Sequence, residues 1–268
     1  MYAHARGRYD LFRVRLRGAG DTATGQLLRP RGVAGPLPAV LLNNGRELNS
    51  EALEYLPPEF GDLIVLSLDY PEEVPYEFKP VTLLLENDRV RRQLRRIPKI
   101  FSLGGAYLTQ RSDVDSSRIA MVVTSFAVPF GVLAAAKDQR FQNVGLIYGA
   151  GNLGDVLEAN LSETPGLLRK IAGWLASEIY SEFEPTQYVG AIAPRHLIMV
   201  NGRDDPQMPV QAVRALYDAA REPRTLIWLK TGHLLPTNQR LIRALVDTTL
   251  ARLPVLEGVN KKTRTAPP

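Results

Sequence analysis

The sequence contains no cysteine among its 268 residues and only three histidines. The missing thiol excludes disulfide bonds, thiolate metal sites and a cysteine nucleophile. No two of His4, His196 and His233 have the short helical spacing of a zinc-binding motif. We therefore expect no metal and no other cofactor.

Long hydrophobic runs are also missing. No window approaches the roughly 18 consecutive apolar residues of a membrane span, and the opening MYAHARGRYDLF lacks the apolar core of a signal peptide. We expect a cytoplasmic protein with no membrane partner. The apolar content of 45% suits one globular domain, which we place at residues 1–254. The end of the chain, EGVNKKTRTAPP, has almost no apolar content and predicts a disordered tail, which we place at residues 255–268.

The net charge of +5 comes mostly from arginine. The densest basic run, DRVRRQLRRIPK at residues 88–99, places its basic and apolar side chains on separate stripes with helical spacing. This pattern predicts an amphipathic helix with a solvated basic face. Stacking aromatics do not interleave with the arginines, so we expect no nucleic-acid partner. A polyanion-binding role for this run stays an alternative, and the sequence leaves open whether the chain forms a homodimer.

Short apolar runs alternate with helical stretches along most of the chain. An antiparallel pair at residues 11–16 and 24–30 comes first. Further strands are expected at 39–43, 63–69, 118–124, 144–149, 196–201 and 225–230, and helices at about 51–57, 82–110, 126–137, 209–221 and 236–253. The alternation predicts an α/β fold, doubly wound around a mostly parallel sheet of about eight strands. Ligands of such sheets bind beyond the carboxyl ends of the strands.

One connection is longer than the others. Over forty residues separate the strands at 144–149 and 196–201, and they include helical stretches at 153–159 and 165–180. A segment of this length is more than a turn. It predicts a small helical lid insertion at about residues 151–190, with a packed crossover as the alternative.

Two serines compete for the role of nucleophile. Ser102 lies in FSLGG, which looks like a sharp catalytic turn, but a helical pattern precedes and follows it. Gly104 and Gly105 fall on the apolar face of that helix, where small residues allow close approach to a sheet. Ser125 instead follows the strand at 118–124, and Pro129 suits the first turn of the next helix. This context favours Ser125 as a nucleophile, although the position alone also suits a helix N-cap.

An aspartate and a histidine occupy equivalent loops. Asp205 follows the strand at 196–201, with Asp204 as a solvated neighbour, and His233 follows the strand at 225–230. Ser125, Asp205 and His233 therefore each fall at the carboxyl end of a different predicted strand. The combination is more specific than its parts.

At these positions the chain resembles the α/β-hydrolase superfamily, in particular serine esterases and dienelactone-hydrolase-like members, from about residue 11 to 253. The matching motifs are the strand, elbow and helix at Ser125, the pattern Gly202-x-x-Asp205-x-x-x-Pro209, and Gly232-His233. The resemblance implies that Ser125 is the nucleophile, His233 the general base and then acid, and Asp205 the group that orients the imidazole.

The resemblance also implies a reaction. The backbone N–H of Phe126 and that of Gly45, or of Arg46, would form the oxyanion hole. The expected function is hydrolysis of carboxylic esters, or of related small-molecule acyl substrates, through an acyl-enzyme.

The elbow departs from the family pattern G-x-S-x-G. Val123 and Ala127 replace the two glycines, and LLNNGRE at residues 41–47 replaces the usual His-Gly loop. Valine adds bulk where a strand and a helix approach closely. A catalytically impaired hydrolase-fold binding protein is therefore the alternative.

Overall fold

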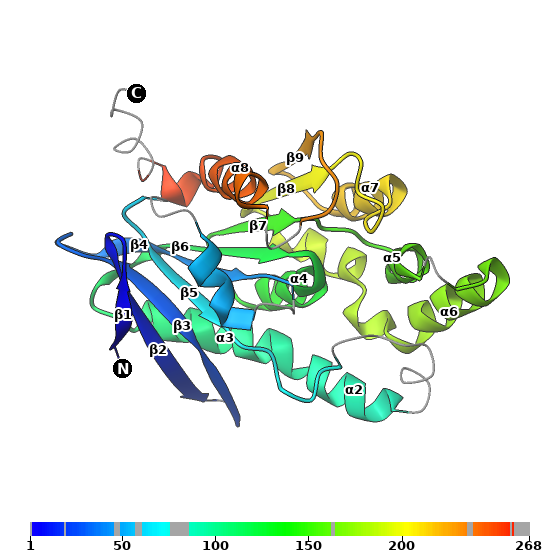
Figure 1. Ribbon diagram of the computed structural model, residues 1–268, viewed down its shortest axis with the longest axis horizontal. Helices are drawn as coiled ribbons and strands as arrows, with labels where there is room; N and C mark the ends of the chain where they lie inside the picture. The colour runs from blue at the N-terminus through cyan, green and yellow to red at the C-terminus, as the bar shows by residue number, and fades with distance from the viewer. Residues whose placement is uncertain are drawn as a thin grey trace.

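The computed structural model describes residues 2–18, 20–45, 49–56, 61–75, 86–161, 164–234, 238–257 and 259. Within these residues nine strands form one mixed sheet in the order β1-β2-β3-β5-β4-β6-β7-β8-β9 (Figure 1). Helices α3 and α4 cover one face of the sheet and α8 covers the other. This arrangement is the doubly wound α/β architecture that the sequence predicts.

The strands are β1 (Tyr2–Arg6), β2 (Tyr9–Gly18), β3 (Asp21–Pro30), β4 (Leu37–Asn43), β5 (Ile64–Leu68), β6 (Val114–Thr124), β7 (Asn143–Ile147), β8 (His196–Gly202) and β9 (Arg224–Leu229). β2 and β3 form the predicted antiparallel pair, and all neighbours from β5 to β9 are parallel. The sequence pattern does not predict β1, because YAHAR has no apolar run; this strand pairs with β2 at the edge of the sheet.

The helices are α2 (Asn87–Leu94), α3 (Arg96–Thr109), α4 (Val128–Lys137), α5 (Leu153–Asn160), α6 (Gly166–Ile179), α7 (Val210–Ala219) and α8 (Gln239–Leu250). Short 3-10 helices are η1 (Asn49–Tyr55), η2 (Ser125–Ala127), η3 (Ser181–Phe183), η4 (Pro185–Gln187), η5 (Val189–Ile192) and η6 (Pro254–Leu256).

The predicted helix at 82–110 is divided in two. α2 ends at Leu94 and α3 begins at Arg96. Pro98 explains the break, because it has no N–H for the Leu94 carbonyl and its ring crowds that carbonyl. Residues 82–85 of the prediction lie outside the described residues, as do residue 57 and residues 236–237 of two other predicted helices.

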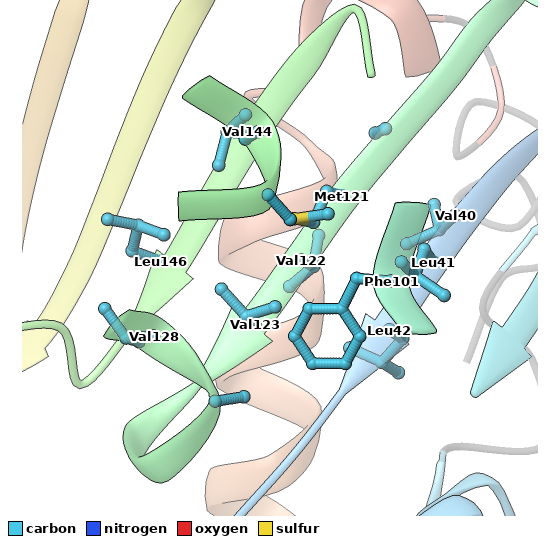
Figure 2. Close-up of a cluster of buried hydrophobic side chains, with 14 of the residues drawn as sticks. Val40, Leu41, Leu42, Phe101, Met121, Val122, Val123, Val128, Val144 and Leu146 are labelled. Atoms are coloured by element: carbon cyan, nitrogen blue, oxygen red, sulfur yellow. The ribbon is translucent and has the colours of Figure 1, made fainter. Parts of the chain in front are cut away.

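Helix α3 packs closely on the sheet. A Cβ atom added to Gly104 would lie 2.8 Å from Leu68 Cδ1, and one added to Gly105 would lie 2.8 Å from the ring of Phe141. Figure 2 shows Phe101 of the same helix beside Leu41 and Leu42 of β4. The predicted packing role of FSLGG is confirmed, and Ser102 lies inside a helix.

The long connection between β7 and β8 contains α5, α6 and η3 to η5. α5 and α6 extend beyond the carboxyl end of the sheet (Figure 1). Glu184 closes the base of this excursion, because its carboxylate accepts the N–H groups of Asn152 at 3.0 Å and Leu153 at 2.9 Å. The start of α5 and the end of the α5–α6 segment at Glu184 are therefore held together.

The predicted tail begins at residue 255. Val255 donates its N–H to Asn143 Oδ1 at 2.9 Å, and Leu256 is buried in η6. Residues 260–268 lie outside the described residues. In the part of the chain that the structure describes, no helix is both long and apolar enough to cross a membrane.

Candidate active site

Ser125 occupies a sharp turn between β6 and α4. β6 ends at Thr124, η2 follows directly, and Pro129 lies in the first turn of α4. The φ angle of Ser125 is +51°, in the left-handed region that non-glycine residues rarely adopt. Such strain concentrates at functional sites, because surrounding packing must hold it in place. The predicted sequence of strand, turn and helix is confirmed.

The bulk of Val123 fits this turn because α4 presents a glycine to it. Val123 is fully buried, and a Cβ atom added to Gly131 would lie 2.6 Å from Val123 Cγ2. Figure 2 shows Val123 in a buried cluster that also contains Val128 of α4. The strand and the helix therefore approach closely with the small residue on the helix side.

A chain of hydrogen bonds runs from Ser125 to a carboxylate. Ser125 Oγ lies 3.2 Å from His233 Nε2, and His233 Nδ1 lies 2.7 Å from Asp205 Oδ2. With Nδ1–H donating to the carboxylate, Nε2 is left to accept the serine hydroxyl proton. The Asp205 side chain is 0% exposed and that of His233 only 14% exposed. Solvent therefore screens this pair weakly.

The structure brings Asp205, and not Asp204, to the histidine. Asp205 Oδ1 also accepts the N–H of Gln207 at 2.8 Å, which fixes the carboxylate from its second oxygen. Asp204 is exposed, and its backbone N–H donates to the Thr231 carbonyl at 3.1 Å. Three loops, after β6, β8 and β9, thus converge on one point at the carboxyl edge of the sheet.

These three loops and the sheet behind them can be compared with known proteins. No family model matches the sequence, and no curated protein matches it. Acetyl xylan esterase 1 from a Thermoanaerobacterium species matches the structure with a TM-score of 0.67 at 15% identity, over 92% of this chain and 86% of that one. An acetyl xylan esterase from a Paenibacillus species matches with a TM-score of 0.67 at 17% identity, over 93% and 87% of the two chains.

A third similar structure is the α/β hydrolase GrgF from a Penicillium species, with a TM-score of 0.57 at 15% identity over 90% of this chain and 99% of that one. The chain has the α/β-hydrolase fold. The fold expected from the three motifs is therefore confirmed.

In this hydrolase fold, sequence reasoning misses Tyr148, which supports the histidine loop. Tyr148 follows β7 with a φ of +53°, and its hydroxyl donates to the Gly232 carbonyl at 3.0 Å. Its ring lies 4.8 Å from the His233 ring. Burial, together with the charge of Asp205, raises the pKa of Tyr148 to about 12. In the sequence, Tyr148 is simply the one aromatic residue of the strand expected at 144–149.

Gly202 packs directly against the loop that carries His233. A Cβ atom there would lie 2.4 Å from the Thr231 carbonyl oxygen and 3.2 Å from the ring of Tyr148. Any larger residue would displace the segment that carries His233. This contact gives a physical reason for the glycine in the Gly202-x-x-Asp205 motif.

The two residues expected at the oxyanion hole lie on neighbouring loops of the hydrolase fold. Phe126 follows Ser125 directly. In the parallel register Asn43 pairs with Val123, so Gly45 and Ser125 each lie two residues beyond a paired position. Arg46, the other expected donor, lies outside the described residues.

Tyr70 connects these two loops. Its hydroxyl donates to the Asn44 carbonyl, and its ring meets the ring of Phe126 edge-on at a centroid distance of 5.4 Å. The buried side chain of Asn43 fixes the end of β4, because its amide donates to the Leu68 carbonyl at 2.6 Å. Both loops beside Ser125 are thus held by side chains that sequence reasoning does not identify.

A cavity of about 650 Å³ opens at Ser125. Its walls come from the elbow, from α5 and α6, and from the loop after β8; they include Phe130, Leu157, Tyr180 and Met208. The described residues that line it include no charged side chain. Among the described residues, no group of three or more His, Asp or Glu side chains is arranged to hold a metal ion. This cavity suits an uncharged, largely apolar molecule.

Proposed function

We propose that the protein is a serine hydrolase that cleaves small carboxylic esters through an acyl-enzyme. The observation that carries the proposal is the contact chain from Ser125 Oγ through His233 to Asp205, with the serine in a left-handed turn. Both similar acetyl xylan esterases are named as enzymes that act on esters, which supports this reaction class.

In the proposed mechanism His233 Nε2 takes the proton of Ser125 Oγ as that oxygen attacks the ester carbonyl. The tetrahedral intermediate collapses when His233 returns the proton to the leaving alkoxide, and an alcohol departs. Water then gives a proton to His233 and attacks the acyl-enzyme, which releases the acid and restores Ser125. Asp205 stabilises the transient imidazolium through Nδ1–H.

The oxyanion of each tetrahedral intermediate accepts the N–H groups of Phe126 and Gly45 in this proposal. Loss of one such donor generally lowers turnover by about a hundredfold or more. Tyr70 supports the geometry, since it contacts both loops. We assign it a positioning role, because its hydroxyl bonds to the Asn44 carbonyl and its ring packs on Phe126.

The substrate in this proposal carries an uncharged, largely apolar acyl or alcohol group. The described part of the cavity lining supports this choice: it has no charged side chain, so an ionised group would lose its hydration there without gaining a partner from it. We further propose that the insertion at residues 151–190 acts as a lid, since α5 and α6 form one wall of the cavity. The natural ester is then selected by chain length and shape.

Labelling with a fluorophosphonate tests the proposal, because only an activated serine is phosphonylated. We expect one adduct, mapped by mass spectrometry to the peptide that contains Ser125. The Ser125→Ala variant loses the label, and the matched Ser102→Ala variant keeps it.

The absence of labelling on a folded protein would favour the alternative, an impaired hydrolase fold that only binds its ligand. The motives for that alternative are the bulk of Val123 and the loop at residues 41–47 that replaces the usual His-Gly. The space that Gly131 leaves for the side chain of Val123 weakens the first of these motives.

A further inference from the structure

A second hollow lies on the far side of the cavity wall. It has a volume of about 910 Å³ and follows the outer face of α3, between the end of β2 and the last turns of α4. We call it the α3 groove. Phe183 borders both the α3 groove and the cavity at Ser125, so the two spaces lie back to back. The mechanism proposed above uses no residue of this groove.

The α3 groove is strongly basic. Among its described lining residues, one carboxylate, that of Glu182, faces six cationic side chains: Arg15, Arg17, Arg95, Lys99, Lys137 and Arg140. These cations come from β2, from the junction of α2 and α3 and the first turn of α3, and from the end of α4 and the loop after it. Several like charges around one concave surface add up to a positive potential that attracts anions.

Most of this charge is not compensated. Arg95 pairs with Glu182 at 2.6 Å, and Arg140 pairs with Asp138 at 2.7 Å. The other four cations, Arg15, Arg17, Lys99 and Lys137, are exposed and form no ion pair within the described part of the chain. The groove therefore holds more positive charge than its own carboxylates neutralise.

The floor of the groove is apolar. α3 contributes Leu103, Ala106 and the ring of Tyr107, and α4 contributes Leu133. A cationic rim around an apolar floor suits a ligand with an apolar body and anionic groups at its edge. The volume lies within the range of small-molecule sites, about 300–1,000 Å³.

We propose that the α3 groove binds a small organic polyanion. Its ligand has an apolar or aromatic body and two or more phosphate, sulfate or carboxylate groups. The anionic groups meet the uncompensated cations of the rim, and the body covers the floor formed by α3. A long polymer is not the favoured ligand, because the cations surround one hollow instead of extending in a row.

The test uses two probes, adenosine triphosphate and inorganic triphosphate, titrated into the full-length protein by calorimetry. We expect saturable binding of both, with adenosine triphosphate at least threefold tighter because it alone covers the apolar floor. Binding of both weakens when salt is raised from about 50 to about 200 mM, because salt screens exposed charges.

Two variants locate the site. Arg17→Gln combined with Lys137→Gln neutralises cations on opposite walls, and we expect at least tenfold weaker binding. The matched control, Arg214→Gln with Arg240→Gln, removes two exposed cations from α7 and α8, and we expect affinity within twofold of the unchanged protein. Ala106→Glu places a carboxylate on the floor and abolishes binding, while an unchanged thermal midpoint shows that the variant is folded.

Three results would overturn the proposal. The first is no saturable binding of either probe. The second is an equal loss of probe affinity in the control variant, Arg214→Gln with Arg240→Gln. This result would show that affinity depends on the net charge of the protein and not on the groove. The third is tight binding of a single-stranded oligonucleotide, with an affinity that increases with oligonucleotide length and persists in the Ala106→Glu variant. This result would indicate that a polymer binds on an open surface. Fluorophosphonate labelling of Ser125 is independent of all three, so this site and the proposed esterase activity can fail separately.

Discussion

At the elbow, the side chain of Val123 on β6 occupies the space that a side chain at Gly131 on α4 would need. We predict that Val123→Gly lowers the free energy of unfolding by about 2–4 kcal/mol, because it leaves a cavity and adds backbone freedom. Gly131→Ala alone costs about 1–3 kcal/mol, because its methyl group collides with the valine. Urea unfolding measures both.

The double variant checks this explanation. In Val123→Gly with Gly131→Ala the new methyl group enters the space that the valine leaves. The combined loss of stability is then smaller than the sum of the single losses by about 1 kcal/mol or more, as expected for residues in contact. Strictly additive losses would show that the two positions do not share this volume.

The adjacent carboxylates Asp204 and Asp205 give a second prediction. Only Asp205 contacts His233, at 2.7 Å, and it is buried. Asp205→Asn should lower kcat for a p-nitrophenyl ester by about a thousandfold or more, because the amide no longer holds the productive tautomer. Asp204→Asn should stay within a few-fold. A larger loss in the Asp204 variant, at equal thermal midpoints, would contradict the assignment.

At the scale of elements, the α5–α6 insertion depends on its base. Glu184 accepts the first N–H groups of α5, a helix that buries none of its own residues. We predict that Glu184→Gln speeds amide exchange in residues 152–160, because the helix N-terminus loses a negative charge and one of two acceptor oxygens. Because α5 lines the cavity at Ser125, we also expect KM of the Glu184→Gln variant, measured over a series of esters, to rise most for the longest acyl chains.

Glu178→Gln is the matched control for this variant. Glu178 is exposed on α6 and does not bond to α5. Its exchange pattern and KM values should match those of the unchanged protein. Equal exchange in the Glu184 and Glu178 variants would show that the base of the insertion does not depend on this carboxylate.

Most elements follow from local patterns in the sequence. Apolar runs predict β4 to β9. β4, β5 and β7 are buried at every position, and strands buried on both faces need apolar residues at nearly every position. The break at Arg95 is harder to predict, since Pro98 also suits the first turn of a helix. β1 is not predicted, because its pairing with β2 depends on backbone hydrogen bonds and not on side-chain alternation.

The candidate site is predictable only in part. Ser125, Asp205 and His233 can be identified because chain order and strand ends are visible in a sequence. Tyr148, Tyr70 and Gly131 cannot be assigned in this way, because each acts through a contact with a residue on another element. The cavity and the α3 groove likewise depend on how several elements pack together.

At the scale of the whole molecule, buried tyrosines make stability depend on pH. Burial raises the pKa of Tyr148 and that of Tyr180 to about 12, whereas a tyrosine in an unfolded chain ionises near about 10. Their contribution to stability is complete below pH 10 and is lost as pH rises towards about 12, because ionisation then favours the unfolded chain.

The Tyr180→Phe variant tests this dependence. The Tyr180 hydroxyl is buried and has no hydrogen-bond partner among the described residues, so its removal should leave stability at pH 8 unchanged or higher. Between pH 10 and 12 the variant should lose less unfolding free energy than the unchanged protein. Parallel loss in both proteins, measured by urea unfolding at each pH, would show that Tyr180 does not contribute.

The central claim is that Ser125 in its strained turn is the nucleophile, and that Ser102 inside α3 is not. The most direct measurement is kcat for hydrolysis of a short p-nitrophenyl ester by two variants of equal thermal midpoint. Ser125→Ala should lower turnover to the background rate, and Ser102→Ala should leave it within a few-fold of the unchanged protein. An active Ser125→Ala variant beside an inactive Ser102→Ala variant would contradict the account.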